Sequence, residues 1–219
     1  TTEHNKYIGG RLRMVLYRIT DFLTDLNTNV SKEATELFVK CKSFSENKTM
    51  SIYNGIDLEK FFHYESKATS IREKYGINEE DFVFINVGRL TEAKNHKGLI
   101  DVFTLLVEKY KNMKLLIVGT GELENELQGF GVVLVEAMAC ELPVVTTDAG
   151  GCAEVVDDPQ FVVPVGDLNI LYQKMEQIYL MKPQTRMVLG SVNREKSRRF
   201  DLHSICDQWV TVYTKFIKA

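Results

Sequence analysis

The stretch FVFINVG, residues 82–88, decides the fold class of this 219-residue chain. It is an almost continuous apolar run of strand length, which is typical of a β-strand that is buried on both faces. A segment with helical periodicity follows at 96–110, and a second apolar run, KLLIVG, follows at 114–119. Buried strands that alternate with helices indicate a parallel sheet with helices on both faces.

The same alternation continues toward the C-terminus, so we predict one doubly wound α/β domain over residues 58–195. The expected elements are helices at 121–128 and 129–141, a strand at 143–147, a short helix at 150–156, a strand at 161–165 and a helix at 167–181. Outside this series we expect a helix at 11–27, a strand at 28–31, a helix after the N-cap Ser31, a turn at Asn54-Gly55, a helix at 67–75 ended by Gly76 and an amphipathic helix at 200–217.

One junction breaks the alternation. The expected helix GELENELQ, 121–128, runs directly into GFGVV at residue 129. A parallel sheet needs a strand between successive helices of one layer. Either the topology is unusual or residues are missing between Gln128 and Gly129, and we favour the second interpretation. The chain also begins with Thr1 and not with Met, which raises the same question for its N-terminus.

The overall composition is ordinary for a cytosolic protein. Charged residues make up 26% of the chain and the net charge is −3, which argues against a dominant nucleic-acid surface. We find no apolar run of about 18 residues that would span a membrane, and no secretory leader. The four cysteines form no C-x-x-C pair, so we expect reduced thiols, with Cys140 and Cys206 on apolar helical faces.

Glu136 stands alone in an apolar segment, GFGVVLVEAMACELPVV, at 129–145. On a helix its surface neighbours, three and four positions away, are Val132, Val133, Ala139 and Cys140. A polar group that is buried without a partner costs about 2–7 kcal/mol. Glu136 therefore needs a partner, which is either another side chain or a ligand.

Two basic residues, Arg89 and Lys94, lie in VGRLTEAKN at 87–95, directly after the first buried strand. Ligands bind at the carboxyl ends of the strands in a parallel sheet. Arg binds phosphate with a planar fork of donors and Lys supplies a point charge. The pair is either a diphosphate clamp or two solvated charges in a loop.

Three glycine motifs lie at the same expected edge of the sheet. VGTGE, 118–122, has Gly119 and Gly121 but lacks the third small residue of a dinucleotide fingerprint, so a tight turn explains it equally well. GFG, 129–131, precedes the helix of Glu136, where free N–H groups suit a phosphate or a sugar hydroxyl. DAGGCAE, 148–154, places Glu154 in a first helical turn, where an acid also stabilises its own helix.

Other catalytic signals are weak. His4 is a lone histidine among polar residues, and nothing near it in sequence marks it as catalytic. No D-x-D motif occurs, which speaks against a Mg or Mn site for a nucleotide-sugar diphosphate. We see no Cys–His or Ser–His–Asp nucleophile system.

In this order, the motifs resemble those of the family-4 (group 1) retaining glycosyltransferases, which have the GT-B fold of two facing Rossmann-like domains. The matching stretches are NGID (54–57), VGRLTEAKN (87–95), IVGTGE (117–122), GFGVVLVEAMACELPVVTTDAGGCAE (129–154) and RFDLHSICDQWVTVY (199–213). The resemblance implies that 1–57 is the remnant of an N-terminal, acceptor-side domain. It implies that 58–195 is the nucleotide-sugar-binding domain and that 196–219 holds a helix that crosses back to the first domain.

The resemblance also implies roles for individual residues. Arg89 and Lys94 would neutralise the donor diphosphate, and Glu136 would bind the ribose hydroxyls. The other implied site residues are Gly121, Gly129, Phe130, Gly131 and Asn54 on the donor side, with His4 facing the sugar. The implied activity is transfer of a sugar from a UDP- or GDP-linked donor to a sugar or lipid-linked acceptor. The transfer proceeds with retention of anomeric configuration, without a metal or other cofactor, and no nucleic acid takes part. Members of the family are often attached transiently to the inner face of a membrane.

Three departures from the family pattern affect these expectations. Gln128 stands where the family has a second Glu, and members carry roughly fifty more residues at that point, which supports a missing segment. Glu141 replaces a usual Gly at a helix end, where a left-handed residue other than glycine costs about 1 kcal/mol. Most of the N-terminal domain is absent. We therefore expect the chain alone to be a poor catalyst, and keep two alternatives: a nucleotide-sugar-binding module without catalysis, and a nucleotide-sugar epimerase of the same shape.

Overall fold

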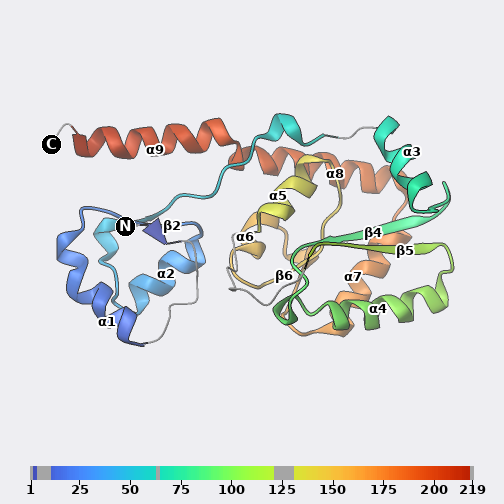
Figure 1. Ribbon diagram of the computed structural model, residues 1–219, viewed down its shortest axis with the longest axis horizontal. Coiled ribbons are helices and arrows are strands. Elements are labelled where there is room, and N and C mark those ends of the chain that lie inside the picture. Colours follow the sequence, from blue (N-terminus) through green and yellow to red (C-terminus); the bar gives the residue numbers. More distant parts are fainter. Residues whose placement is uncertain (1, 4–10, 63–64, 121–130, 218–219) are drawn as a thin grey trace.

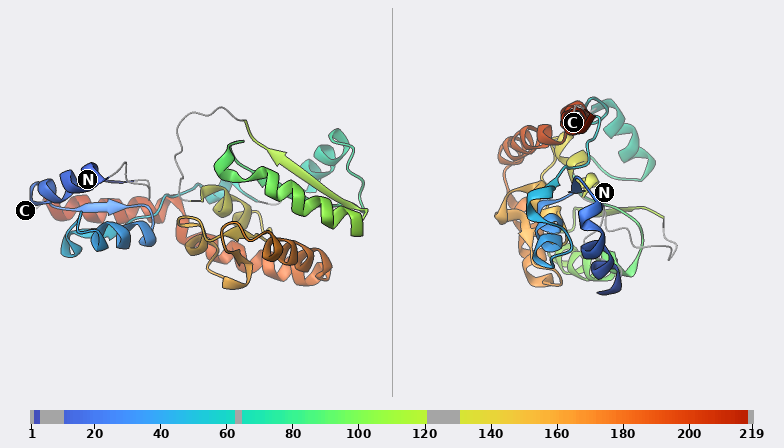
Figure 2. Two further views of the ribbon diagram at one scale, coloured as in Figure 1. Left: turned by 90° about the horizontal axis from the view of Figure 1, so that it is seen from below. Right: turned by 90° about the vertical axis from the view of Figure 1, so that its left-hand side faces the viewer.

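The computed structural model describes residues 2–3, 11–62, 65–120 and 131–217, and arranges them in two lobes (Figure 1). The first lobe holds the strands and helices up to residue 51. The second lobe extends from α3 to α8. The last helix, α9 (Leu202–Ile217), leaves the second lobe and runs along the side of the first, as both views of Figure 2 show.

The first lobe is a small parallel sheet with helices. Its strands are β1 (Thr2–Glu3), β2 (Asn27–Asn29) and β3 (Thr49–Ser51), in the order β1-β2-β3. Its helices are α1 (Arg11–Thr20) and α2 (Lys32–Lys40), with short 3₁₀ turns η1 (Asp21–Leu23) and η2 (Glu46–Lys48). Ser31 caps α2 as predicted, because its side chain accepts a hydrogen bond from the Ala34 N–H at 3.2 Å. The α-helix predicted for 11–27 ends earlier, at Thr20.

The second lobe contains two separate pairs of parallel strands. β4 (Phe82–Val87) pairs with β5 (Met113–Val118), and β6 (Thr146–Thr147) pairs with β7 (Val162–Val163). The α/β class with parallel strands is confirmed. The single continuous sheet is not seen, because no ladder joins the two pairs within the described residues. β6 and β7 are also shorter than the predicted strands at 143–147 and 161–165.

Helices cover these strands (Figure 1). They are α3 (Glu65–Lys74), α4 (His96–Lys109), α5 (Val132–Ala139), α6 (Cys152–Val156), α7 (Leu168–Leu180) and α8 (Pro183–Ser197), with 3₁₀ turns η3 (Leu58–Lys60), η4 (Glu92–Lys94), η5 (Pro159–Phe161) and η6 (Arg198–Phe200). The sequence patterns did not predict α8, which packs against α5. The helix predicted at 121–128 lies outside the described residues.

Two helix ends show how the chain leaves a helix. α3 is followed by Gly76 with φ +62°, as expected for a glycine at this position. α5 is followed by Glu141 with φ +60°, and the Leu142 N–H donates to the Ala137 carbonyl at 3.1 Å. This is the bond pattern of a Schellman motif, so the left-handed conformation predicted for Glu141 is confirmed.

Two apolar clusters form the core. One packs α4 and β5 against α7 through Val102, Leu106, Met113 and Met175. The other contains Val135, Met138, Val155 and Phe200 of the second lobe and also Val30 of the first. The two lobes therefore share buried apolar surface and are not independent bodies on a tether.

The chain crosses between the lobes twice, and the two crossings are bonded to each other. The Ile56 N–H donates to the Phe200 carbonyl, and the Leu202 N–H donates to the Ile56 carbonyl, each at 2.9 Å. Gly55 lies so close that a Cβ would meet the Leu202 Cα at 2.9 Å, so a glycine is required here. Farther along α9, Cys206 is exposed, which corrects the expectation that it lies on a packed apolar face.

Candidate functional site

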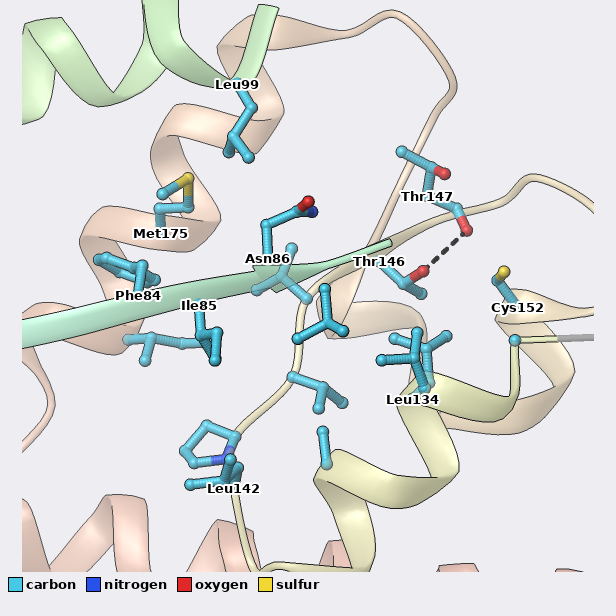
Figure 3. A pocket seen from close by; sticks show the side chains of 18 of the residues that line it. Phe84, Ile85, Asn86, Leu99, Leu134, Leu142, Thr146, Thr147, Cys152 and Met175 are labelled. Carbon is cyan, nitrogen blue, oxygen red and sulfur yellow. Dashed lines mark hydrogen bonds between the residues drawn. The ribbon is translucent and has the colours of Figure 1, made fainter. Parts of the chain in front are cut away.

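A cavity of about 1810 Å³ lies in the second lobe and opens toward the first. Its walls are β4, residues 142–147, the N-terminal part of α5 and one face of α7. On the side of the first lobe it is lined by Asn29, Val30 and Ser31. Figure 3 shows Phe84, Ile85 and Asn86 on one side, with Leu142, Thr146 and Thr147 on the other. The lining is mostly apolar with a few polar groups, which is typical of ligand sites.

Glu136 is half-buried and lines this cavity. Burial raises the pKa of its carboxyl. Within the described part of the chain, no hydrogen bond or ion pair engages its carboxylate. The sequence had left a side chain or a ligand as the partner of Glu136, and no described side chain fills that place. The arrangement suits a ligand that donates hydrogen bonds, such as a diol.

The two basic residues of the predicted clamp follow β4. Lys94 is exposed and lines the cavity at the start of α4, next to the N-cap Asn95. Arg89 is exposed in the same loop but does not line the cavity. Lys94 and the first turn of α4 together offer positive charge and positive partial charge to an anion.

The start of α5 lies beside the start of α6. Gly131 is the N-cap of α5, and a Cβ on it would meet the Cys152 sulfur at 3.2 Å. No described side chain caps α5. The Leu134 N–H donates to the Gly131 carbonyl at 2.9 Å, and Gly131, Val132 and Val133 line the cavity. Burial raises the pKa of the Cys152 thiol, while a hydrogen bond with Thr146 and the charge of Lys94 act in the opposite direction.

Gly119 has a structural reason to be glycine. A Cβ at this position would lie 1.8 Å from the Gly88 carbonyl oxygen, so the loops after β4 and β5 could not approach as they do. The close approach of these two loops therefore explains Gly119 without a ligand.

Glu154 contacts a helix that the sequence did not link to it. It lies in the first turn of α6, yet its carboxylate accepts hydrogen bonds from the Lys32 N–H at 3.0 Å and the Glu33 N–H at 2.6 Å. The Tyr53 hydroxyl also donates to it at 3.2 Å. Glu154 thus caps α2 of the first lobe and ties the two lobes together. The expectation that it stabilises its own helix missed this longer-range contact.

Asn29 is a lining residue that sequence reasoning missed. Its side chain is fully buried at the end of β2, where its Oδ1 accepts from the Val30 N–H at 2.8 Å. Among the described residues, its Nδ2 has no hydrogen-bond partner. The available signal was the polar run NTN in a buried strand, because a buried polar side chain implies a partner.

The remaining predicted residues do not reach the cavity within the described structure. Asn54 lies at the crossing between the lobes and is not a lining residue. His4, Gly121, Gly129 and Phe130 lie outside the described residues.

Solved structures with the same arrangement define the class of fold. The chain superposes on Anabaena HepE, solved in complex with UDP and glucose, with a TM-score of 0.78 and 19% identity, over 98% of this chain and 71% of that one. This likeness shows a GT-B fold, as the motif order had predicted.

The family follows from the sequence matches. Two models, each described as glycosyl transferases group 1, match residues 67–129 and 125–180, so that together they span more than half of the chain. The chain belongs to the group 1 glycosyltransferases.

Curated relatives agree with this assignment. The capsular polysaccharide biosynthesis glycosyltransferase CapM of Staphylococcus aureus is 27% identical over 208 residues, which cover 75% of this chain and 54% of CapM. The N-acetyl-alpha-D-glucosaminyl L-malate synthase of Bacillus anthracis is 24% identical over 235 residues, which cover 89% of this chain and 59% of the synthase. The chain thus spans little more than half the length of these relatives.

Proposed function

We propose that this chain is the donor-binding part of a glycosyltransferase. The complete protein would transfer a sugar from a UDP- or GDP-linked donor to a sugar or lipid-linked acceptor. Membership of the group 1 family supports the activity, and UDP in the related Anabaena structure supports the uridine donor. Retention of configuration and independence of metal are part of the proposal and rest on the motif resemblance.

The observation that carries the proposal is Glu136. It lines the large cavity with a raised carboxyl pKa and without a described side-chain partner. A charged carboxylate in that setting gains most from a ligand that donates two hydrogen bonds, because such bonds to a charged acceptor are strong. The two ribose hydroxyls of a nucleotide have this chemistry.

The groups around Glu136 suit the rest of a nucleoside diphosphate sugar. We propose that Lys94, which lines the cavity at the start of α4, binds the diphosphate together with Arg89 of the same loop. The uncapped start of α5 at Gly131 adds backbone N–H donors. Negative charge that builds on the leaving diphosphate would be stabilised by these fixed donors and charges, which is the usual source of catalysis in group transfer.

The acceptor is the part of the reaction in which the relatives differ. One relative is named for capsular polysaccharide biosynthesis and another for the synthesis of N-acetyl-alpha-D-glucosaminyl L-malate, so the products differ within the family. We also propose transient attachment of the complete enzyme to the inner face of a membrane, which rests on the motif resemblance. No helix of the described residues is both long and apolar enough to cross a bilayer.

The test is nucleotide binding, measured by calorimetry with UDP and with 2′,3′-dideoxy-UDP. Glu136→Gln is expected to weaken UDP binding much more than binding of the dideoxy analogue. Arg89→Ala and Lys94→Ala are expected to weaken both ligands several-fold. Lys97→Ala is a matched control, because Lys97 is an exposed lysine near Lys94 that does not line the cavity.

Unchanged affinity in Arg89→Ala and Lys94→Ala would refute the clamp. An equal loss for both ligands in Glu136→Gln would make Glu136 structural. Release of UDP from a UDP-sugar by the complete protein separates an enzyme from a binding module, and transfer to an acceptor separates a transferase from an epimerase.

A further inference from the structure

The side-chain amide of Asn29 has one end with a partner and one end without. Asn29 is the last residue of β2 and is only 1% exposed. Its Oδ1 accepts a hydrogen bond from the Val30 N–H at 2.8 Å. Only the oxygen of an amide can accept from an N–H, so this bond fixes the orientation of the amide group. The Nδ2 atom keeps its N–H donors without a partner within the described structure.

Asn29 differs in one respect from Asn27, two residues earlier in the same strand. Asn27 is also fully buried, and its Nδ2 donates to Asp21 Oδ1 at 2.7 Å. The Oδ1 of Asn27 has no partner among the described residues, so an unpartnered atom does not by itself mark a ligand site. Asn29 borders the cavity, however, and Asn27 does not. A buried donor at the wall of a cavity has a specific explanation, which is a ligand atom that accepts from it.

The backbone around Asn29 is fixed at the cavity wall. The Ile52 N–H donates to the Asn29 carbonyl at 2.9 Å, which joins Asn29 to the segment after β3. Val30 is buried in the same apolar cluster as Val135 of α5. Glu154 of α6 accepts hydrogen bonds from the first backbone N–H groups of α2. Because the chain is held on both sides of Asn29, its amide is preorganised and a ligand does not have to order it.

These contacts place the end of β2 beside the starts of α5 and α6. Gly131 and Cys152 stand at those starts and line the cavity, as Figure 3 shows for Cys152. Burial is the main cause that raises the pKa of the Cys152 thiol, and the charges of Lys94 and Glu33 act on it in opposite directions. Both charges therefore lie near Cys152. One end of the cavity thus brings together Asn29, the start of α5 and Lys94.

The sugar of the proposed donor would lie at this end of the cavity. Glu136 follows Gly131 by five residues, which is about 7–8 Å along the helix axis. In a nucleoside diphosphate sugar, the diphosphate stands between the ribose and the sugar. With the ribose at Glu136 and the diphosphate at Lys94, the sugar is the next group along the ligand, and Asn29 borders the end of the cavity that Lys94 occupies.

We propose that Asn29 determines which sugar is bound, because its Nδ2 donates a hydrogen bond to a hydroxyl oxygen of the sugar that the nucleotide carries. This inference rests on the proposed function, since it takes the cavity as the site of a nucleotide sugar. The second lobe binds the nucleotide and the first lobe recognises the sugar. A fixed, buried donor discriminates against a ligand that lacks the matching oxygen, because the donor then stays unpaired.

Calorimetry with UDP, UDP-glucose and UDP-N-acetylglucosamine tests this role. The quantity compared is the ratio of the affinity for the more tightly bound sugar nucleotide to the affinity for UDP. Asn29→Leu keeps the approximate size of the side chain and removes the donor. It should lower this ratio about tenfold, as expected for one lost hydrogen bond to a buried donor, and change the affinity for UDP less than about twofold. An unchanged ratio, or an equal loss for UDP and the sugar nucleotide, would overturn the proposal.

Asn27→Leu is the matched control. It changes the same residue type in the same strand, at a buried position that does not line the cavity. It should leave the ratio of affinities as it is in the parent chain. If Asn27→Leu lowers the ratio as much as Asn29→Leu does, the effect comes from the fold of the first lobe, and the proposal is overturned.

Thermal unfolding without any nucleotide gives a second, independent result. Asn29→Leu loses only a bond between neighbouring residues and removes a donor that has no described partner. Asn27→Leu loses a bond to the carboxylate of Asp21, so it should lower the unfolding midpoint more. A larger fall in Asn29→Leu would mean a structural role and would overturn the proposal.

The two sites fail in different ways. A parent chain that does not bind UDP refutes the nucleotide site of the proposed function. A parent chain that binds UDP, with an unchanged ratio of affinities in Asn29→Leu, refutes the role of Asn29 alone.

Discussion

Replacing Glu154 with alanine should weaken the junction between the two lobes. Its carboxylate accepts the backbone N–H groups of Lys32 and Glu33, at 3.0 and 2.6 Å, and the Tyr53 hydroxyl at 3.2 Å. These bonds join α6 of the second lobe to the start of α2 in the first. We expect Glu154→Ala to lower the free energy of unfolding by about 2–3 kcal/mol.

The magnitude follows from the setting of these bonds. A hydrogen bond to a charged group contributes about 1.5–3 kcal/mol, and an anion at a helix N-terminus adds about 0.3–1 kcal/mol. Lys32 is exposed and Glu33 and Tyr53 are only half-buried, so water can replace part of each lost bond, and the expected total of about 2–3 kcal/mol lies well below the sum of the three bonds. Glu154→Gln keeps one acceptor oxygen but loses the charge, so it should cost about half as much.

Urea denaturation measures the loss, and amide hydrogen exchange locates it. The control is Asp167→Ala, which removes the N-cap of α7 within the second lobe, where Asp167 accepts from the Ile170 N–H at 2.9 Å. A lost N-cap costs about 1 kcal/mol. Only Glu154→Ala should speed exchange at Lys32 and Glu33. The reasoning is refuted if Glu154→Ala costs no more than Asp167→Ala and leaves those two amides protected.

Three further predictions follow from single groups. Burial, and then the charge of Glu154, raise the pKa of Tyr53 to about 12. The phenolate absorbance change that Tyr53→Phe removes should therefore have its midpoint near pH 12, and Glu154→Gln should lower that midpoint. Stability should be lost as the pH rises from about 10 to about 12, and a midpoint near pH 10 would contradict this prediction. Glu141→Gly should raise the free energy of unfolding by about 0.5–1 kcal/mol in urea denaturation, because Glu141 has φ +60°, and a lower stability would argue against backbone strain there. Exposed Cys206 should react with a thiol reagent well before Cys152, because burial raises the pKa of the Cys152 thiol. Mass analysis of the labelled peptides measures the order of reaction, and the reverse order would refute the burial argument.

The local part of the fold could be predicted from the sequence. The strands at 82–88 and 114–119 and the helix at 96–110 were found from their apolar patterns. The prediction that the first strand is buried on both faces was wrong, because Ile85 is 52% exposed and Val87 is 43% exposed. The ends of helices were equally readable at Ser31 and Gly76, since each carries a specific backbone conformation or hydrogen bond. α8 was missed because it is largely polar, and Met187 and Val188 on it are exposed, so no clear apolar stripe marks it.

Long-range features could not be read from the pattern. Nothing in the neighbourhood of Glu154 shows that its carboxylate caps a helix more than a hundred residues earlier in the chain. At the candidate site, the solitary position of Glu136 predicted a partner that is either a side chain or a ligand, and no described side chain takes that place. The sequence also pointed to the junction at 128/129, but the division of the described strands into two separate pairs became visible only in three dimensions.

The paired crossings at Ile56 and at Phe200–Leu202 restrict how the lobes can move. A single linker would let one lobe swing in any direction relative to the other. Here two strands of chain run side by side, with a hydrogen bond on each side of Ile56. A movement that preserves those bonds has essentially one degree of freedom, a rotation about the axis of the paired segments. Each such rotation would then return Asn29, Val30 and Ser31 of the first lobe to the same place at the cavity of the second lobe.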